Sequence, residues 1–177
     1  VKGLRVADPS LENTHMGPLV DRGHRDSVER YVQLGRDEGG RILCGGARPQ
    51  GGYYEQGSYY LPTVIEGLPN TARMCREEIF GPVAPIVRFK TEAEAIALAN
   101  DTEYGLVSYA YTQDLKRGLR LVEKLDTGMT GLNTGLVSNA AAPFGGVKQS
   151  GLGREGGLEG IHEYLETKYV MIPDPNL

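Results

Sequence analysis

The sequence predicts an α/β fold with a parallel βαβαβ core. Three short extended runs, at 83–89, 107–111 and 129–133, are separated by two segments whose apolar residues recur at helical spacing. Strands that alternate with helices over so short a stretch pair in parallel through right-handed crossovers. Ligands on such sheets bind beyond the carboxyl ends of the strands, which places residues 133–144 at the predicted functional rim.

The elements before this core are less regular. Turn signals dominate the first part of the chain, and a first helix is predicted from about Asp21, which can cap it, to Glu38, before a glycine pair that ends it. The segments that follow are predicted as a short strand at 41–44, a glycine-rich loop at 45–58 and an extended run at 59–65. Pro62 favours an edge or irregular position for that last run.

Two helices are predicted inside the core. Thr91 and Glu94 form a capping box that opens the first of them, and Tyr104-Gly105 closes it. The second spans about 115–125 and carries an apolar face at helical spacing, composed of Leu115, Leu119, Val122 and Leu125.

The last segment has a different pattern. A short helix is predicted at 158–166 and an apolar strand at 168–172. A terminal strand has an unpaired edge unless something covers it, so this strand is predicted to be an oligomerisation element. Pairing with a sheet of the same chain stays open as the alternative. We therefore expect a main domain at 1–157 and an oligomerisation tail at 158–177.

Composition excludes several classes of protein. The net charge is −4 and 40% of the residues are hydrophobic, so we expect no nucleic-acid partner. No run approaches the roughly 18 apolar residues of a membrane span, and the start resembles no targeting segment, so a cytoplasmic protein is expected. The two cysteines and three scattered histidines form no metal or disulfide pattern. Cys44 is predicted to be a buried small hydrophobe; Cys75 stands beside Arg76, which could favour thiolate. The histidines are predicted to be surface residues.

The segment Glu77–Val83 carries the most informative pattern. Adjacent carboxylates on an extended backbone cannot face one another, so Glu77 and Glu78 are not an acid/base pair. A carboxylate followed two residues later by an aromatic places Glu78 and Phe80 on one side of such a backbone. A carboxylate can accept two hydrogen bonds from a ribose-like diol while a phenyl face packs against a flat ring. A solvated Glu pair before a core Phe is the alternative.

A second segment suggests pocket lining. Small polar residues at 133–139 lead to Phe144, which is framed by glycines at 145–151. A plain loop is the alternative. Within the following residues, 151–156 fit the G-x-G-x-x-G pattern of dinucleotide loops. That pattern requires a strand before it and a long helix after it, and no strand is expected at 145–150, so we give it no such role.

These motifs together carry a family resemblance. The strings Met16-Gly17-Pro18-Leu19, Glu77–Val83, Pro143–Gly146 and Ser150–Glu155 occur in this order and at similar distances in aldehyde dehydrogenases. The match runs through practically the whole chain, which resembles the carboxy-terminal part of such an enzyme. Residues 133–139 and 160–170 are most similar to the succinate-semialdehyde group. The resemblance identifies 1–157 as part of the catalytic domain and implies a homo-oligomer.

The resemblance implies a role for four residues. Glu78 matches the glutamate that binds the nicotinamide-ribose hydroxyls of NAD or NADP, and Phe80 matches the aromatic beside the nicotinamide. Phe144 matches an aromatic in the substrate tunnel, and Ser138 falls where a serine helps to bind the distal carboxylate of the substrate. The implied reaction is thiolate attack on an aldehyde, hydride transfer to the nicotinamide, and release of the acid by water activated by a glutamate.

The family's nucleophilic cysteine, general base and dinucleotide-binding domain have no counterpart in the chain, where we expect no catalytic residue. The isolated chain is therefore predicted to be inactive, and the rest of the dehydrogenase polypeptide is its implied partner. A non-catalytic assembly module that pairs through 158–172 is the alternative function. A free-standing dinucleotide-binding domain that uses 151–156 ranks last.

Overall fold

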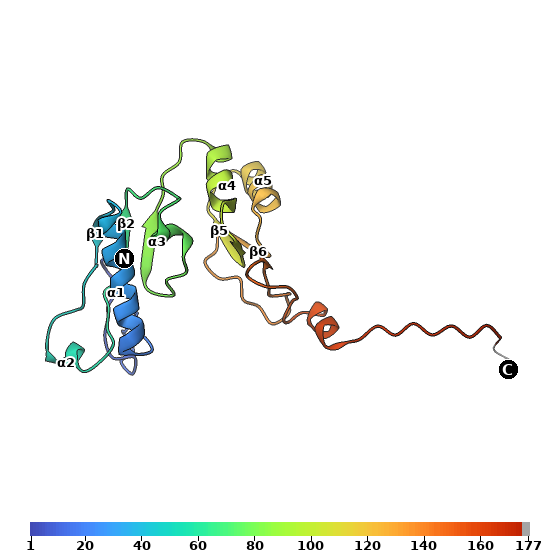
Figure 1. The fold of residues 1–177 in the computed structure, drawn as a ribbon, viewed down its shortest axis with the longest axis horizontal. Helices are drawn as coiled ribbons and strands as arrows, with labels where there is room; N and C mark the ends of the chain where they lie inside the picture. Colours follow the sequence, from blue (N-terminus) through green and yellow to red (C-terminus); the bar gives the residue numbers. More distant parts are fainter. Residues whose placement is uncertain (175–177) are drawn as a thin grey trace. The chain divides into compact units, whose positions relative to one another are not determined.

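The computed structural model describes residues 1–174, in two compact units, Val1–Phe89 and Lys90–Leu177 (Figure 1). Each unit combines helices with strands, some of them parallel, which confirms the α/β class. The predicted division into a main domain at 1–157 and an oligomerisation tail at 158–177 concerns assembly and stays a prediction. The last residues of that tail, 175–177, lie outside the described part.

The first unit places one long helix against a three-stranded sheet. Helix α1 (Arg22–Asp37) begins where the Asp21 carboxylate accepts a hydrogen bond of 2.7 Å from the His24 amide, as the sequence predicts. Strand β2 (Thr63–Glu66) lies between β1 (Arg41–Cys44), to which it is antiparallel, and β3 (Val83–Ile86), to which it is parallel. Two single-turn helices complete the unit, α2 (Gly52–Glu55) and α3 (Arg73–Arg76).

The core of this unit lies between α1, α3 and the sheet. Val28 and Val32 of α1 and Ile65 of β2 are fully buried, and Met74 of α3 is nearly so. Each such side chain contributes roughly 1.5–3 kcal/mol by leaving water. Gly35 allows the close approach of α1, because a Cβ there would overlap the Met74 sulfur and the Ile65 side chain. Helix α1 is therefore fixed to the sheet.

The expectation of an edge or irregular position for residues 59–65 is confirmed for Pro62, which lies in irregular backbone, and wrong for the strand itself. The strand begins only at Thr63, and it is the central strand rather than an edge. Pro62 precedes the strand, so its missing N–H removes no bond from the ladder. Proline does occur inside β3, as Pro85, and β3 is the last strand in the sheet order, where a proline is tolerated.

The second unit contains a parallel βαβ motif. Strand β5 (Val107–Ala110) pairs in parallel with β6 (Met129–Leu132), and helix α5 (Leu115–Lys124) connects them. The predicted continuation to a third parallel strand is not formed, because β3 pairs with β2 in the first unit instead. Helix α4 (Glu92–Asn100) precedes the motif, and its cap Thr91 accepts the predicted bond from the Glu94 amide at 3.2 Å.

Helix α5 does not bury the face that its sequence favours. Gly118 packs against Leu132 of β6, whereas Leu115 and Leu119 are 71% and 60% exposed. The small residue lets the helix approach the sheet closely. The leucine face is left without cover among residues 1–174.

A short antiparallel pair joins two distant segments of this unit. Strand β4 (Tyr104–Gly105) pairs with β7 (Val147–Lys148), so the expectation of no strand at 145–150 is wrong, and Tyr104-Gly105 is a strand rather than a helix end. The Lys148 ammonium binds the Asp126 carboxylate at 2.7 Å and the Asn100 carbonyl at 3.1 Å. These contacts are distant in sequence, and local patterns do not predict them.

The tail fits its prediction in part, because a short helix forms where one is expected but no strand follows it. Residues Glu159–Tyr164 form a 3₁₀ helix, η1, and no strand is assigned between residues 165 and 174. Figure 1 draws this segment as an extended trace without an arrow. A strand requires a paired neighbour, and the tail pairs with no segment of the described chain. Pairing with a sheet of the same chain, the alternative, is therefore not found among residues 1–174, whereas pairing with a second copy stays a prediction.

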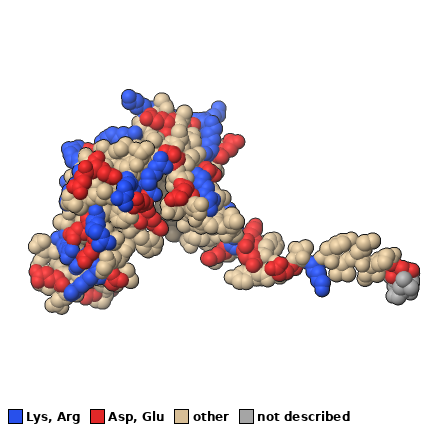
Figure 2. Space-filling model, viewed as in Figure 1, with Lys and Arg blue, Asp and Glu red and all other residues tan. Residues whose placement is uncertain are grey.

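Charged side chains are mixed over the visible surface. Figure 2 shows acidic and basic groups interspersed, in agreement with the small net charge of −4. Through residue 174, none of the helices combines the length and the apolar character that a membrane crossing would need.

Candidate functional site

The segment Glu77–Gly81 connects α3 to β3 at one end of the first unit's core. The Glu77 amide closes the turn of α3 by donating to the Arg73 carbonyl at 2.9 Å. At the other end, the Pro82 carbonyl accepts a bond of 2.8 Å from the amide of Thr63 in the central strand. Both ends of the segment are thus tied to regular structure.

Glu77 faces the protein. Its carboxylate accepts hydrogen bonds from the Tyr31 hydroxyl at 2.8 Å and from Arg73 Nε at 2.7 Å. The Arg73 guanidinium, and after it the Tyr31 hydroxyl, hold the pKa of Glu77 below its usual value. The same contact with Glu77, followed by burial, raises the pKa of Tyr31. Glu77 is thus an ionised anchor rather than an acid/base group.

Glu78 faces the other way. The backbone at Glu77 is extended, with φ −93° and ψ 145°, and neighbouring side chains on an extended backbone point to opposite sides. Glu78 is exposed, and its carboxylate has no hydrogen-bond or ion-pair partner among the described residues. An open carboxylate of this kind can accept two hydroxyl hydrogen bonds, as the sequence predicts for a diol.

Phe80 follows two residues later and is 81% exposed. The expectation of an extended backbone up to Phe80 is wrong, because its φ is +52°, in the left-handed region that a bulky side chain rarely adopts. Its carbonyl accepts a hydrogen bond of 2.8 Å from His24 Nε2, and the two rings meet edge to face at 6.4 Å between centroids. Gly81 then fits against α1, where a Cβ would lie 2.6 Å from Val28 Cγ2.

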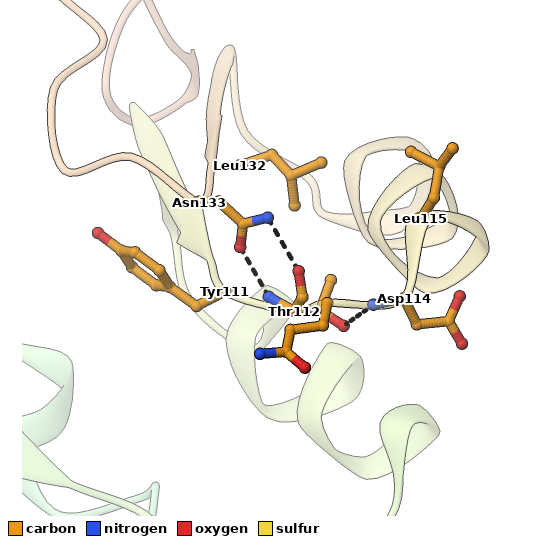
Figure 3. Close-up of a pocket in the computed structure, with 7 residues that line it drawn as sticks. Tyr111, Thr112, Asp114, Leu115, Leu132 and Asn133 are labelled. Carbon is orange, nitrogen blue, oxygen red and sulfur yellow. Dashed lines mark hydrogen bonds between the residues drawn. The ribbon is translucent and has the colours of Figure 1, made fainter.

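A hollow of about 650 Å³ lies at the carboxyl ends of β5 and β6 in the second unit, and Asn133 is the lining residue that belongs to the predicted rim 133–144 (Figure 3). Asn133 bridges these ends: its side chain accepts from the Thr112 amide and donates to the Thr112 carbonyl, both at 2.8 Å. The carboxamide thus continues the hydrogen bonding between the two strands by one residue beyond their carboxyl ends. Tyr111, Asp114 and Leu115 also line this hollow, and the sequence did not single them out.

Ser138 and Phe144 lie further along the same unit. Ser138 is exposed in an irregular segment and lines neither this hollow nor the next. Phe144 is half-buried and exchanges two backbone hydrogen bonds of 2.7 Å with Glu155. It borders a separate hollow of about 390 Å³ together with the glycine-rich segments 145–146 and 151–153. Ser138 and Phe144 are therefore not found together in either of these two hollows.

Neither cysteine has the surroundings of a nucleophile. Burial, and after it the charge of Glu38, raises the pKa of the Cys75 thiol; Arg76 does lower that pKa, as the sequence suggests, but the two other effects outweigh it. Cys44 is half-buried in β1, less than predicted for a small core residue. Residues 1–174 contain no cluster of three or more His, Cys, Asp or Glu suited to a metal ion.

The glycine pattern at 151–156 fails as a dinucleotide loop. The strand β7 does precede it, contrary to expectation, but the long helix that should open after it is not found in the described segment. Only the 3₁₀ helix η1 follows.

Comparison with known proteins establishes the family. Residues 1–170 match the model of the aldehyde dehydrogenase family. The chain belongs to that family. It is 50% identical over 171 residues to a succinate-semialdehyde dehydrogenase of Paenarthrobacter nicotinovorans, with 97% of this chain and 36% of that protein covered. It is 45% identical to the NADP(+) succinate-semialdehyde dehydrogenase GabD of Escherichia coli K12, with 97% and 35% covered.

A solved aldehyde dehydrogenase confirms the fold. The betaine aldehyde dehydrogenase of Staphylococcus aureus, solved in complex with NAD+, is similar with a TM-score of 0.91 and 40% identity. The similarity covers 94% of this chain and 33% of that one. The chain thus spans about a third of the length of the dehydrogenases that it matches.

Proposed function

We propose that the chain is part of an NAD(P)-dependent dehydrogenase that oxidises an aldehyde with a distal carboxylate, with succinate semialdehyde as its substrate. The observation that carries this proposal is the unpaired, exposed carboxylate of Glu78, two residues before the exposed Phe80, on a segment tied to the core at both ends. The similarity to two succinate-semialdehyde dehydrogenases supports the substrate class.

In this proposal, Glu78 binds the two hydroxyls of the nicotinamide ribose and Phe80 covers the nicotinamide end of NAD or NADP. The nicotinamide supplies the hydride acceptor when the cofactor is bound. Orienting it matters because an error of about 1 Å in the reacting atoms can lower the rate about 100-fold. Ser138 binds the carboxylate of the substrate and Phe144 lines the aldehyde passage. The exposed hydroxyl of Ser138 and the half-buried ring of Phe144 suit these roles.

A comparison of two glutamates tests the cofactor site in the full-length enzyme that contains residues 1–177. Glu78→Gln keeps the shape of the side chain and removes its charge, so we expect KM for the cofactor to rise about tenfold and kcat to fall by a similar factor. Glu12→Gln is the control, because Glu12 is exposed in the same unit. Equal kinetics for both variants would disprove the role of Glu78.

The nucleophile comes, in this proposal, from polypeptide outside residues 1–177. The raised pKa of Cys75 supports it, since a protonated and half-buried thiol is a poor nucleophile. The exposed leucines of α5 also favour additional polypeptide as cover. The purified chain should therefore produce no NADH or NADPH from succinate semialdehyde. Turnover that Cys75→Ala abolishes would contradict this expectation.

The tail supports a homo-oligomer, and it would equally serve a non-catalytic assembly module. Its apolar side chains from Leu165 to Ile172 are exposed, which suits pairing with a second copy. Sedimentation should show that the chain self-associates and that a version ending at residue 164 does so less. Binding of NAD(P) by the full-length protein separates the two functions, because the assembly module requires none.

A further inference from the structure

We propose that helix α1 aims the cofactor-binding pair Glu78 and Phe80, with His24 and Tyr31 as positioning residues. This inference rests on the proposed function, because it concerns the same site. Neither His24 nor Tyr31 needs to touch the cofactor for it to hold.

The first anchor acts through Glu77. Tyr31 and Arg73 hold its carboxylate from two elements, α1 and α3, with three hydrogen bonds between 2.7 and 3.2 Å. Since the backbone at Glu77 is extended, an inward Glu77 requires an outward Glu78. The direction of Glu78 is therefore set by a contact that Glu78 itself does not make.

The second anchor acts through the Phe80 carbonyl. A carbonyl can only accept, so His24 Nε2 carries the proton in this contact of 2.8 Å. The bond restrains the orientation of the carbonyl of Phe80, the residue whose φ is +52°. A left-handed backbone costs roughly 1–2 kcal/mol for a residue with a side chain, so an external contact is needed to hold it. His24 supplies that contact and faces the Phe80 ring edge-on.

Both anchors belong to one face of one rigid element. His24, Val28 and Tyr31 are spaced by four and three residues, so they lie along a single side of α1. Val28, between the two anchors, is fully buried and packs against Gly81, where a Cβ would lie 2.6 Å from Val28 Cγ2. The helix thus touches the segment at Glu77, Phe80 and Gly81. Glu78 and the Phe80 ring are left as its exposed parts.

Steady-state kinetics of the full-length dehydrogenase tests the proposal with conservative pairs. Tyr31→Phe removes only the hydroxyl, and His24→Ala removes the donor to the Phe80 carbonyl. We expect each to lower kcat with NAD(P) about tenfold, while KM for the aldehyde changes less than about twofold. His24→Gln restores an N–H donor at similar reach, and should recover most of the loss. Arg30→Gln, an exposed neighbour on α1, is the control and should leave kcat unchanged.

The outcomes separate positioning from simple stability and from the proposed function. A purely structural role would lower the unfolding temperature and the active fraction, and His24→Gln would then bring no selective recovery of kcat. Normal kcat in both Tyr31→Phe and His24→Ala, with an impaired Glu78→Gln, would overturn this inference alone. Normal kinetics in Glu78→Gln as well would overturn the proposed function.

Discussion

The two units differ in how they use their apolar residues. In Val1–Phe89, α1, α3 and the sheet enclose a core of fully buried side chains. Between residues 90 and 174, the one buried hydrophobic side chain is Ala110, while Leu115 and Leu119 of α5 and the apolar residues of the tail are exposed. The first unit can thus hold a binding segment rigidly by itself. The second has the strands and helices of a domain without the layer that would close its core.

The largest expected effect contrasts one residue from each unit in the chain 1–177. Ile65→Ala removes a fully buried side chain of β2, and should lower the free energy of unfolding of its unit by roughly 2–5 kcal/mol. Leu119→Ala changes a side chain that is 60% exposed, and should cost less than about 0.5 kcal/mol. Hydrogen exchange of the amides in β2 and β6 reports each unit separately. Similar costs would show that the second unit has a closed core after all.

The contrast also explains what the sequence could predict. The caps Asp21 and Thr91 were predictable because capping depends on residues three positions apart. The parallel pair β5–β6 followed from periodicity. The exposure of the leucines of α5 did not follow from periodicity. An amphipathic pattern predicts that a helix has an apolar face, but not whether the residues that cover this face belong to the same chain segment.

The site was predictable to a similar extent. The motif indicated Glu78 and Phe80, and both are exposed in the structure, while their role as a binding pair stays a proposal. The contacts of His24 with Phe80 and of Tyr31 with Glu77 cross 56 and 46 positions of sequence. His24 was expected to be an ordinary surface histidine, since no local pattern links a helix face to so distant a loop. The left-handed backbone of Phe80 escaped prediction for the same reason.

A smaller effect is expected where Asn133 joins the strands of the second unit. Asn133→Ala removes two hydrogen bonds to Thr112 and places alanine at a φ of +55°, so it should destabilise the β5–β6 pair by about 2 kcal/mol. Asn133→Gly loses the same bonds without the backbone strain, and should cost about 1 kcal/mol less. Exchange of the Thr112 amide measures the difference. Equal losses would exclude a contribution from the left-handed backbone.

The smallest effect concerns the ion pairs that join α4 to α5. Glu92 contacts Arg120 at 2.8 Å and Arg117 at 3.2 Å. Arg120 first, and Arg117 after it, lower the pKa of Glu92 from 4.5 to about 2. Because the folded pKa lies below the unfolded one, the ionised Glu92 stabilises the folded state above pH 4.5. That contribution is lost progressively as the pH falls towards 2.

In Glu92→Gln, the free energy of unfolding of the second unit should therefore fall less steeply as the pH drops from 4.5 to 2. That of the first unit should be unchanged. Urea unfolding at several pH values, followed through amides of α4 and of α1, gives the two profiles. The ion pairs are partly solvent-accessible, so salt should weaken the effect. An acid limb that keeps its slope in Glu92→Gln would mean that α4 and α5 are held together by packing. In that case, the second unit would resemble the first more closely than its exposed leucines indicate.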